Sequence, residues 1–192
     1  MINRTKVLTI ALTGALAAAA LTGCGGSSSS TAPSSVSTAQ VTSPASSAAA
    51  SSVVDDVENG SNDALDGIFN TLLEADPISN QFEIAAMNIE YDFNLPADDV
   101  ASYKGVKSND NGDAGLVLVV EAADGKAQDV ADKLAAYQQD QAAFYGNYAE
   151  FSQAQDNVEN AVIAFKDNTV VMVIASNECT ANLDSAVDNA LA

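Results

Sequence analysis

Two apolar runs near the C-terminus decide the fold, Ala161-Val162-Ile163-Ala164-Phe165 and Thr169-Val170-Val171-Met172-Val173-Ile174-Ala175. They are joined near Asp167 and Asn168, residue types that favour tight turns. Two β-prone runs separated by so short a polar connection predict an antiparallel β-hairpin.

The predicted hairpin is apolar on both faces. In its first strand, Val162 and Ala164 point one way, whereas Ile163 and Phe165 point the other way. A strand of this kind has to be covered on both sides. Two arrangements satisfy that requirement: helices of the same chain on each face, or a partner protein on one of them.

The rest of the downstream chain supplies helices and further strands. Apolar residues recur every three or four positions in the helical segments, but they alternate with polar residues from Met87 to Asn94, which predicts a half-buried strand there. The order of elements predicts one α+β domain over residues 61–192, with a mainly antiparallel sheet, a long central helix, and N- and C-terminal helices. The expected elements are a helix over Asn62–Ala75, strands over Met87–Asn94, Val100–Lys107 and Leu116–Val120, a long helix over Lys126–Tyr148, and a closing helix over Asn182–Leu191.

The N-terminus has the three parts of a bacterial lipoprotein signal. Arg4 and Lys6 form a basic start, and Val7–Ala20 is an apolar run that is too short for a membrane-spanning helix of about 20 residues. The box Leu21-Thr22-Gly23-Cys24 follows, with small residues before a cysteine, as signal peptidase II requires. We expect residues 1–23 to be removed as a signal peptide and Cys24 to carry diacylglycerol. The alternative is an ordinary secreted protein with a chance cysteine.

Lipid on Cys24 determines the expected location. A diacylglyceryl group supplies two acyl chains, and two chains anchor stably where one chain binds only marginally. The Ser- and Ala-rich residues up to about residue 52 and the acidic stretch up to Gly60 are typical of a flexible linker, so residues 24–60 are expected to be a tether. We expect a lipid-anchored protein on the extracytoplasmic face of the cell membrane.

The charge of the chain excludes several kinds of partner. The full chain has seven Lys and Arg against 26 Asp and Glu; without Arg4 and Lys6, five cations remain against the same 26 acids, a net charge of −21. Nucleic-acid binding needs clustered basic residues that neutralise phosphates, so we expect no nucleic-acid partner.

The residue types that the chain lacks exclude several kinds of catalytic and metal site. The chain has no histidine, which excludes histidine-dependent nucleophilic catalysis and histidine-ligated zinc. It also has no tryptophan, and Cys179 is the one cysteine that remains once Cys24 carries lipid, so no internal disulfide is expected. The position of Cys179 near a helix start suggests a stabilised thiolate, but we favour the interpretation of a small half-buried residue. We expect no cofactor, no metal and no catalytic residue.

The C-terminal half resembles a bacterial family known as domain of unknown function 4358, mostly small lipoproteins of Gram-positive Firmicutes. The resemblance runs from about Met87 to Ala175; this chain departs from it at the hairpin turn, where the family often has glycine and this chain has Asp167. It implies a lipoprotein context and a domain size but no activity. The residues that carry it are Asp99, Val100, Tyr103, Leu116–Glu121, Val130, Leu134, Gln141, Phe144, Tyr148, Asn160–Ile163, Lys166, Asn168 and Val170–Ile174.

Two kinds of polar stretch suggest a functional site, but neither has the residues or the position that the function needs. Asn109–Asp113 suggests a calcium loop, but aligning Gly112 with the loop glycine leaves Lys107 and Leu118 where acids belong, so a turn is favoured. The acid pairs Asp55-Asp56 and Asp98-Asp99 suggest general acid–base catalysis, but the first lies in the linker and the second follows a proline and is typical of a cap or turn.

Aromatic residues gather at the end of the long helix, in Tyr137, Phe144, Tyr145, Tyr148 and Phe151. We expect Phe144, Tyr148 and Phe151 to belong to the core. Tyr145 is then offset from that stripe and, together with Gln138 and Gln141, forms a candidate interaction surface, because tyrosine gives rigid amphipathic contact area.

The sequence leaves three function classes. We favour a non-catalytic binding or interaction module at the cell surface, contacting an envelope protein or an extracellular ligand. The main alternative is a carboxylate-dependent extracytoplasmic hydrolase that acts on cell-envelope glycan. Solute capture for a transporter is a third class, which the small domain size disfavours.

Overall fold

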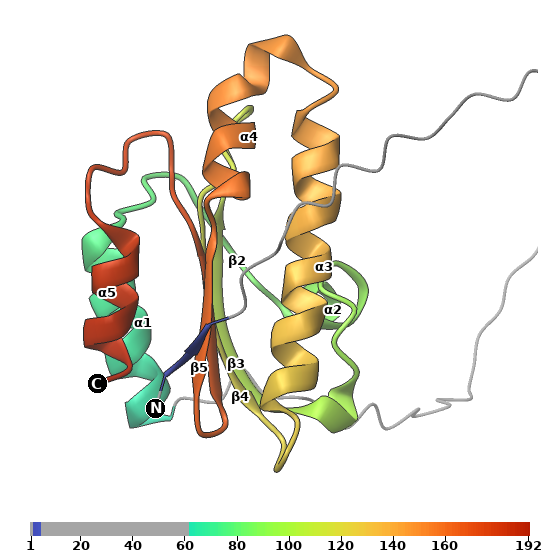
Figure 1. Ribbon diagram of the computed structural model, residues 1–192, viewed down its shortest axis with the longest axis vertical. Helices are drawn as coiled ribbons and strands as arrows, with labels where there is room; N and C mark the ends of the chain where they lie inside the picture. The colour runs from blue at the N-terminus through green and yellow to red at the C-terminus, as the bar shows by residue number, and fades with distance from the viewer. Residues whose placement is uncertain (1, 5–61) are drawn as a thin grey trace, which may run out of the picture. The chain divides into compact units, whose positions relative to one another are not determined.

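A single antiparallel sheet lies between two layers of helices in the computed structural model, which describes residues 2–4 and 62–192 (Figure 1). Helices α1 (Asp63–Ala75) and α5 (Leu183–Ala190) cover one face of the sheet. Helices α2 (Ala86–Tyr91), α3 (Ala127–Tyr145) and α4 (Ser152–Glu159) lie on the other face. The α+β class is confirmed, and helices of the chain itself cover both faces.

The strands run in the order β1-β5-β6-β4-β3-β2, and every neighbouring pair is antiparallel. The predicted hairpin is confirmed: Lys166 pairs with Thr169 across a turn in which Asp167 has a φ of 55°, in the left-handed region. The strands are β1 (Asn3–Arg4), β2 (Gln81–Glu83), β3 (Val100–Ser108), β4 (Leu116–Ala122), β5 (Val162–Lys166) and β6 (Thr169–Ile174).

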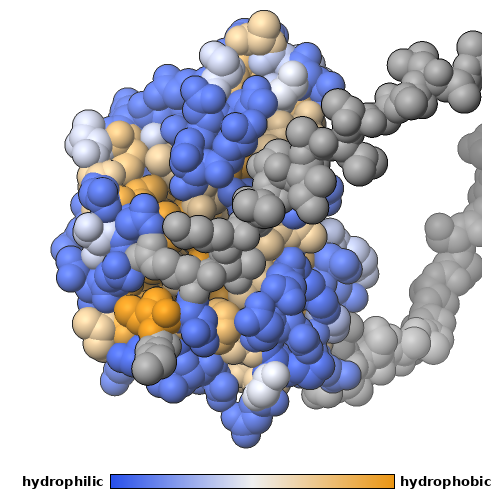
Figure 2. All heavy atoms as spheres, in the orientation of Figure 1, coloured by the Kyte–Doolittle hydropathy of each residue, from blue (hydrophilic) through white to orange (hydrophobic). Residues whose placement is uncertain are grey.

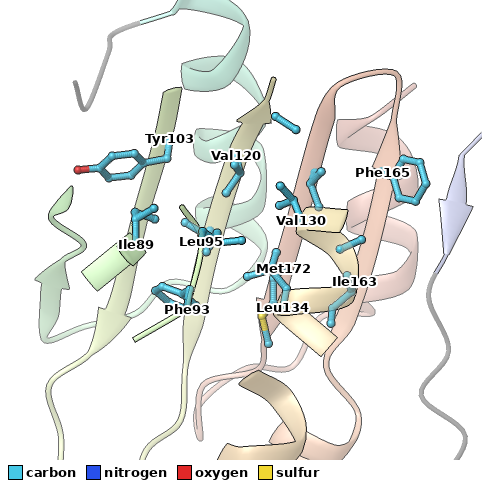
Figure 3. Packing of buried hydrophobic residues seen from close by; sticks show 14 of the residues in the cluster. Ile89, Phe93, Leu95, Tyr103, Val120, Val130, Leu134, Ile163, Phe165 and Met172 are labelled. Atoms are coloured by element: carbon cyan, nitrogen blue, oxygen red, sulfur yellow. The ribbon is translucent and has the colours of Figure 1, made fainter. Parts of the chain in front are cut away.

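Alternation along the central strands builds two cores. In β4, Leu118 and Val120 face α3, whereas Val117 and Val119 face α1. The same alternation holds in the hairpin, where Ile163, Phe165 and Met172 lie in the α3-side core with Leu134 (Figure 3). Each fully buried Val or Leu contributes about 1.5–3 kcal/mol, so the two-faced strands account for much of the stability.

The segment Met87–Asn94, which the alternation predicts to be a strand, is helix α2 followed by a turn at Asn94 with a φ of 53°. Ile89 and Phe93 are buried, but Met87 is 68% exposed and Tyr91 is 73% exposed. Only two of the four alternating apolar residues therefore face the core, and those two are four positions apart, which is helical spacing.

Other boundaries also differ from expectation. The long helix ends at Tyr145 rather than near Tyr148, and it is followed by a 3₁₀ turn η2 (Ala149–Phe151) and by α4, which the sequence did not indicate. The short strand β2 was not expected, and neither was the 3₁₀ turn η1 (Ala97–Asp99) before β3. The N- and C-terminal helices are confirmed, each capped by an asparagine, Asn62 and Asn182.

The predicted signal peptide, Cys24 and the 24–60 linker lie outside the described residues, apart from Ile2–Arg4. None of the helices in the part of the chain that the structure describes has the length and apolar character needed to cross a bilayer.

Candidate functional site

The connection between α3 and α4 extends past the end of the sheet (Figure 1). Gly146 is the C-cap of helix α3, and its N–H donates to the Ala142 carbonyl at 2.9 Å. The N–H of Tyr148 then donates to the Tyr145 carbonyl at 3.0 Å, and that of Phe151 donates to the Tyr148 carbonyl at 3.0 Å. These backbone bonds turn the chain tightly into α4 and fix the positions of the aromatic residues around them.

Four aromatic rings form a closed cluster at this connection, which we call the aromatic tip: Phe144, Tyr145, Tyr148 and Phe151. The ring centroids of Phe144 lie 5.2 Å from Tyr145 and 5.6 Å from Tyr148. Those of Phe151 lie 6.1 Å from Tyr145 and 5.6 Å from Tyr148. All four separations suit favourable tilted or edge-on ring contacts.

The exposure of the tip reverses the sequence expectation. Phe144 and Tyr148, expected in the core, are 50% and 43% exposed, whereas Tyr145, expected to be offset and exposed, is half-buried against the α3-side core. Residues in a helix advance about 100° each, so when Tyr145 continues the buried stripe, Phe144 is turned away from it. Figure 2 shows pale and tan residues over this end of a largely hydrophilic surface.

Gln138 was predicted to form part of an exposed interaction surface, but it is only 7% exposed and does not belong to one. Its Nε2 donates to the Val158 carbonyl at 2.8 Å and to the Glu159 carbonyl at 3.2 Å. The last carbonyls of a helix have no partner within the helix, so Gln138 holds the C-terminal end of α4 against α3.

Gln141 and Tyr145 line a small cavity beside the tip, together with Lys107, Asp113 and Tyr137. The Tyr145 hydroxyl donates to the Asp113 carbonyl at 3.4 Å. Burial, with the Asp113 charge second, raises the pKa of Tyr145 above its usual value. The cavity volume is about 160 Å³, well below the roughly 300–1,000 Å³ of small-molecule sites, so it suits a single inserted side chain or a few waters.

The predicted turn Asn109–Asp113 is confirmed, and it packs against the aromatic tip. Gly112 has a φ of 77°, and a Cβ on it would lie 2.7 Å from the Phe151 ring, so Phe151 packs directly over its backbone. Asp113 Oδ1 accepts from the N–H of Gly115 at 3.0 Å and of Asn177 at 3.1 Å. Among the described residues, no three His, Cys, Asp or Glu side chains are grouped to hold a metal ion.

Asn177, which no sequence motif indicated, joins this turn to α4. Its Nδ2 donates to the Gly112 carbonyl at 2.9 Å, and its own carbonyl accepts from Gln153 Nε2 at 2.9 Å. Asn157 Nδ2 also donates to Asn177 Oδ1 at 3.2 Å. The one available signal in the sequence was a polar residue three positions after the end of β6, and it does not specify these partners. The network fixes α4, and with it the tip, to the sheet.

The buried carboxylates have structural partners. Asp99 contacts Lys126 at 3.1 Å and Lys133 at 3.0 Å, and hydrogen bonds from Lys133 and then Lys126 lower its pKa. Asp76 is fully buried; it accepts from the Ser176 N–H at 2.8 Å and from the Ser176 Oγ at 2.6 Å. Asp98 is exposed, and Asp55-Asp56 lies outside the described residues.

Cys179 is half-buried between β6 and α5, three residues before the cap Asn182. Burial is the main cause that raises the pKa of its thiol above the usual value. A raised pKa opposes thiolate formation, so Cys179 lacks the character of a reactive cysteine, and its placement agrees with the small half-buried residue that the sequence favoured.

The family model for a domain of unknown function (DUF4358) matches residues 75–175, more than half of the 192-residue chain. The chain belongs to this family. The match confirms the resemblance noted from Met87 onward and extends it back to the end of α1. It includes the whole aromatic tip and the turn below it. No curated protein and no solved structure matched the chain. DUF4358 membership carries no activity with it.

Proposed function

We propose that this DUF4358 protein is a non-catalytic binding module, anchored by lipid on Cys24 at the extracytoplasmic face of the cell membrane. Its partner, an envelope protein or an extracellular ligand, contacts the aromatic tip. The observation that carries the proposal is the pair of half-exposed rings, Phe144 and Tyr148, which are held by contacts with the partly buried rings of Tyr145 and Phe151.

The tip has the properties of a binding hot spot. Hot spots are enriched in aromatic residues that are already rigid before binding, because little side-chain entropy is then lost. Here the rings contact one another, and the Gln138 and Asn177 hydrogen bonds hold the supporting helix. The cavity beside the tip has room for one side chain of a partner.

Charge constrains the partner. No lysine or arginine lies between Lys133 and Lys166, whereas this interval contains Asp140, Glu150, Asp156 and Glu159. The surface around the tip is therefore acidic, and a partner that is neutral or basic at its contact region is favoured over an acidic one.

The alternative hydrolase is less well supported. Glycan hydrolysis uses two carboxyl groups about 5–10 Å apart on either side of the scissile bond. The buried carboxylates Asp76 and Asp99 are instead engaged by Ser176 and by two lysines. Solute capture for a transporter is also less well supported, because the cavity beside the aromatic tip is smaller than a typical small-molecule site.

Crosslinking in intact cells tests the binding proposal. A photoreactive amino acid at the exposed position 140, four residues before Phe144 on the same face of α3, is combined with Phe144→Ser and Tyr148→Ser, which remove both exposed rings. The control carries Met87→Ser and Tyr91→Ser, which remove two large side chains from α2 that are even more exposed than those of the tip. We expect a specific crosslinked partner with the unsubstituted tip and the α2 control, and at least tenfold less with the tip variant. Equal capture by all three proteins would show that the tip is not the contact, and no specific partner under any growth condition would count against a binding module.

A further inference from the structure

The two edges of the sheet are protected to different degrees. At one edge, β2 is only three residues long, and all three of its residues are exposed. At the other edge of the folded domain, β5 runs from Val162 to Phe165 with four buried apolar residues before Lys166. Natural sheets protect their edges with short strands and charged residues. By this criterion β2 is protected by its own sequence, whereas β5 has one charge at its end.

The chain itself places a strand on the β5 edge. Asn3 pairs with Phe165 and Arg4 pairs with Ala164, in antiparallel register. Ile2 packs against the core cluster on the α1 and α5 side. Figure 3 shows β1 beside the strand that carries Phe165. The β5 edge thus accepts an extended segment of three residues, with an aliphatic side chain covered by the domain.

The backbone of β5 explains why it accepts a strand. Lys166 and Thr169 close a two-residue turn, so they form a hydrogen-bonded pair. Because hydrogen-bonded and non-hydrogen-bonded pairs alternate, the N–H and C=O groups of Ile163 and Phe165 point away from β6, toward the outer edge. Asn3 lies opposite Phe165, where it can use these groups.

Residues 2–4 belong to the segment that the proposed lipoprotein processing removes, and the inference rests on the proposed function in this respect. Cleavage before Cys24 would leave the outward backbone groups of Ile163 and Phe165 without their strand. Extended peptides commonly bind to proteins by adding a strand to such an edge.

We propose that the β5 edge is a strand-addition site, which after processing binds an extended segment of another envelope protein with an aliphatic and a basic residue two positions apart, as in Ile2-Asn3-Arg4. A second copy of the chain is the less suitable occupant, because each processed chain has a net charge of −21. Helix α5, which packs on the same side of β5 as Ile2, also carries the exposed acids Asp184 and Asp188 one turn apart. A basic strand complements this charge.

A synthetic peptide of residues 1–8 is the probe. It is added to the processed chain, residues 24–192 with Cys24→Ser to remove the lipid, and amide hydrogen exchange is followed by NMR. We expect saturable binding that slows exchange of the Ile163 and Phe165 amides at least tenfold. A peptide with Asn3→Pro should not bind, because it lacks the N–H opposite Phe165. A peptide with Arg4→Glu and Lys6→Glu should bind at least tenfold more weakly.

Two further chains keep the result interpretable. The full chain with Asn3→Pro should exchange Ile163 and Phe165 rapidly and regain protection when the peptide is added. The processed chain with Phe144→Ser and Tyr148→Ser should still bind the peptide, so failure of the aromatic tip and failure of the edge site are separable. Absence of protection at Ile163 and Phe165 would overturn the proposal, as would equal binding of the charge-reversed peptide. Concentration-dependent dimerisation that protects the same amides without peptide would overturn it in favour of a second copy.

Discussion

Gly112 and Gly125 adopt the same left-handed backbone, each with a φ of 77°, in different surroundings. A Cβ on Gly125 would meet nothing within 4 Å, whereas one on Gly112 would lie 2.7 Å from the Phe151 ring. An alanine at either position pays about 1–2 kcal/mol for the left-handed conformation. Comparing alanine substitutions at the two glycines therefore separates the cost of backbone strain from the cost of disturbing the contact with the aromatic tip.

We predict that Gly112→Ala lowers the free energy of unfolding by about 1–3 kcal/mol more than Gly125→Ala, because Phe151 has to move. Urea unfolding of the two variants measures this difference. The movement of Phe151 should also change the near-ultraviolet circular dichroism of the tip tyrosines in Gly112→Ala alone. Equal destabilisation with unchanged spectra in both variants would show that Phe151 does not rest on Gly112.

At the scale of elements, α4 depends on one side chain from another helix. Gln138 donates to two carbonyls at the end of α4, and Val158, which supplies one of them, is fully buried. The Val158 carbonyl also accepts from the Ala161 N–H at 3.1 Å, so truncating Gln138 removes two hydrogen bonds without leaving that carbonyl unpartnered. At about 0.5–1.5 kcal/mol each, the two bonds contribute about 1–3 kcal/mol. The neighbouring Gln139 is exposed on the same helix and provides a matched control.

We predict that Gln138→Ala destabilises the domain by about 1–3 kcal/mol, while Gln139→Ala changes the free energy of unfolding by less than about 0.5 kcal/mol. Hydrogen exchange should accelerate in α4 and at the tip in Gln138→Ala before it does in β4. Uniform acceleration across the whole domain would mean that α4 is not held locally by Gln138.

The elements that the sequence predicted well are those whose burial is unambiguous. The hairpin, β4 and the terminal helices have long apolar patterns or caps that agree with one period, whereas β3 has a less regular pattern of burial. Met87–Asn94 misleads because its alternation includes Met87 and Tyr91, which are exposed, and burial is decided by packing against β3 and α3 rather than by residue type. Packing also explains why the exposures of Phe144 and Tyr145 are the opposite of those predicted. Helix α3 extends beyond the end of the sheet, so its final turn packs against α4, an element that the sequence pattern did not reveal.

At the scale of the whole molecule, acidic charge exceeds what the domain can pair. Three of the 26 acids precede residue 62, which leaves 23 acids and five lysines in residues 62–192, a net charge of −18. All five lysines are already engaged: Lys104 with Asp66, Lys107 with Asp92, Lys126 and Lys133 with Asp99, and Lys166 with the Leu191 carbonyl. The surplus charge repels itself and opposes the compact state.

We predict that salt stabilises the domain. Raising NaCl from about 0.01 M to about 0.15 M shortens the Debye length from roughly 30 Å to roughly 8 Å, and thermal unfolding should shift upward by about 3–5 °C, equivalent to about 1 kcal/mol. Asp140→Lys with Glu150→Lys lowers the net negative charge by four, so this variant should be more stable at low salt and respond less. A fall in Tm with salt would show that the ion pairs outweigh the repulsion.

The proposed lipid anchor also concerns the whole molecule, and the two cysteines provide a matched pair of variants to test it. We predict that Cys24→Ala abolishes processing and leaves precursor or released protein, because the thioether that signal peptidase II requires cannot form. Cys179→Ala should be processed normally, since that thiol is half-buried inside the domain. Detergent-phase partitioning with mass spectrometry distinguishes the two variants. If Cys24→Ala still partitioned into detergent at the mass of residues 24–192, lipid on that thiol could not be what holds the protein to the membrane.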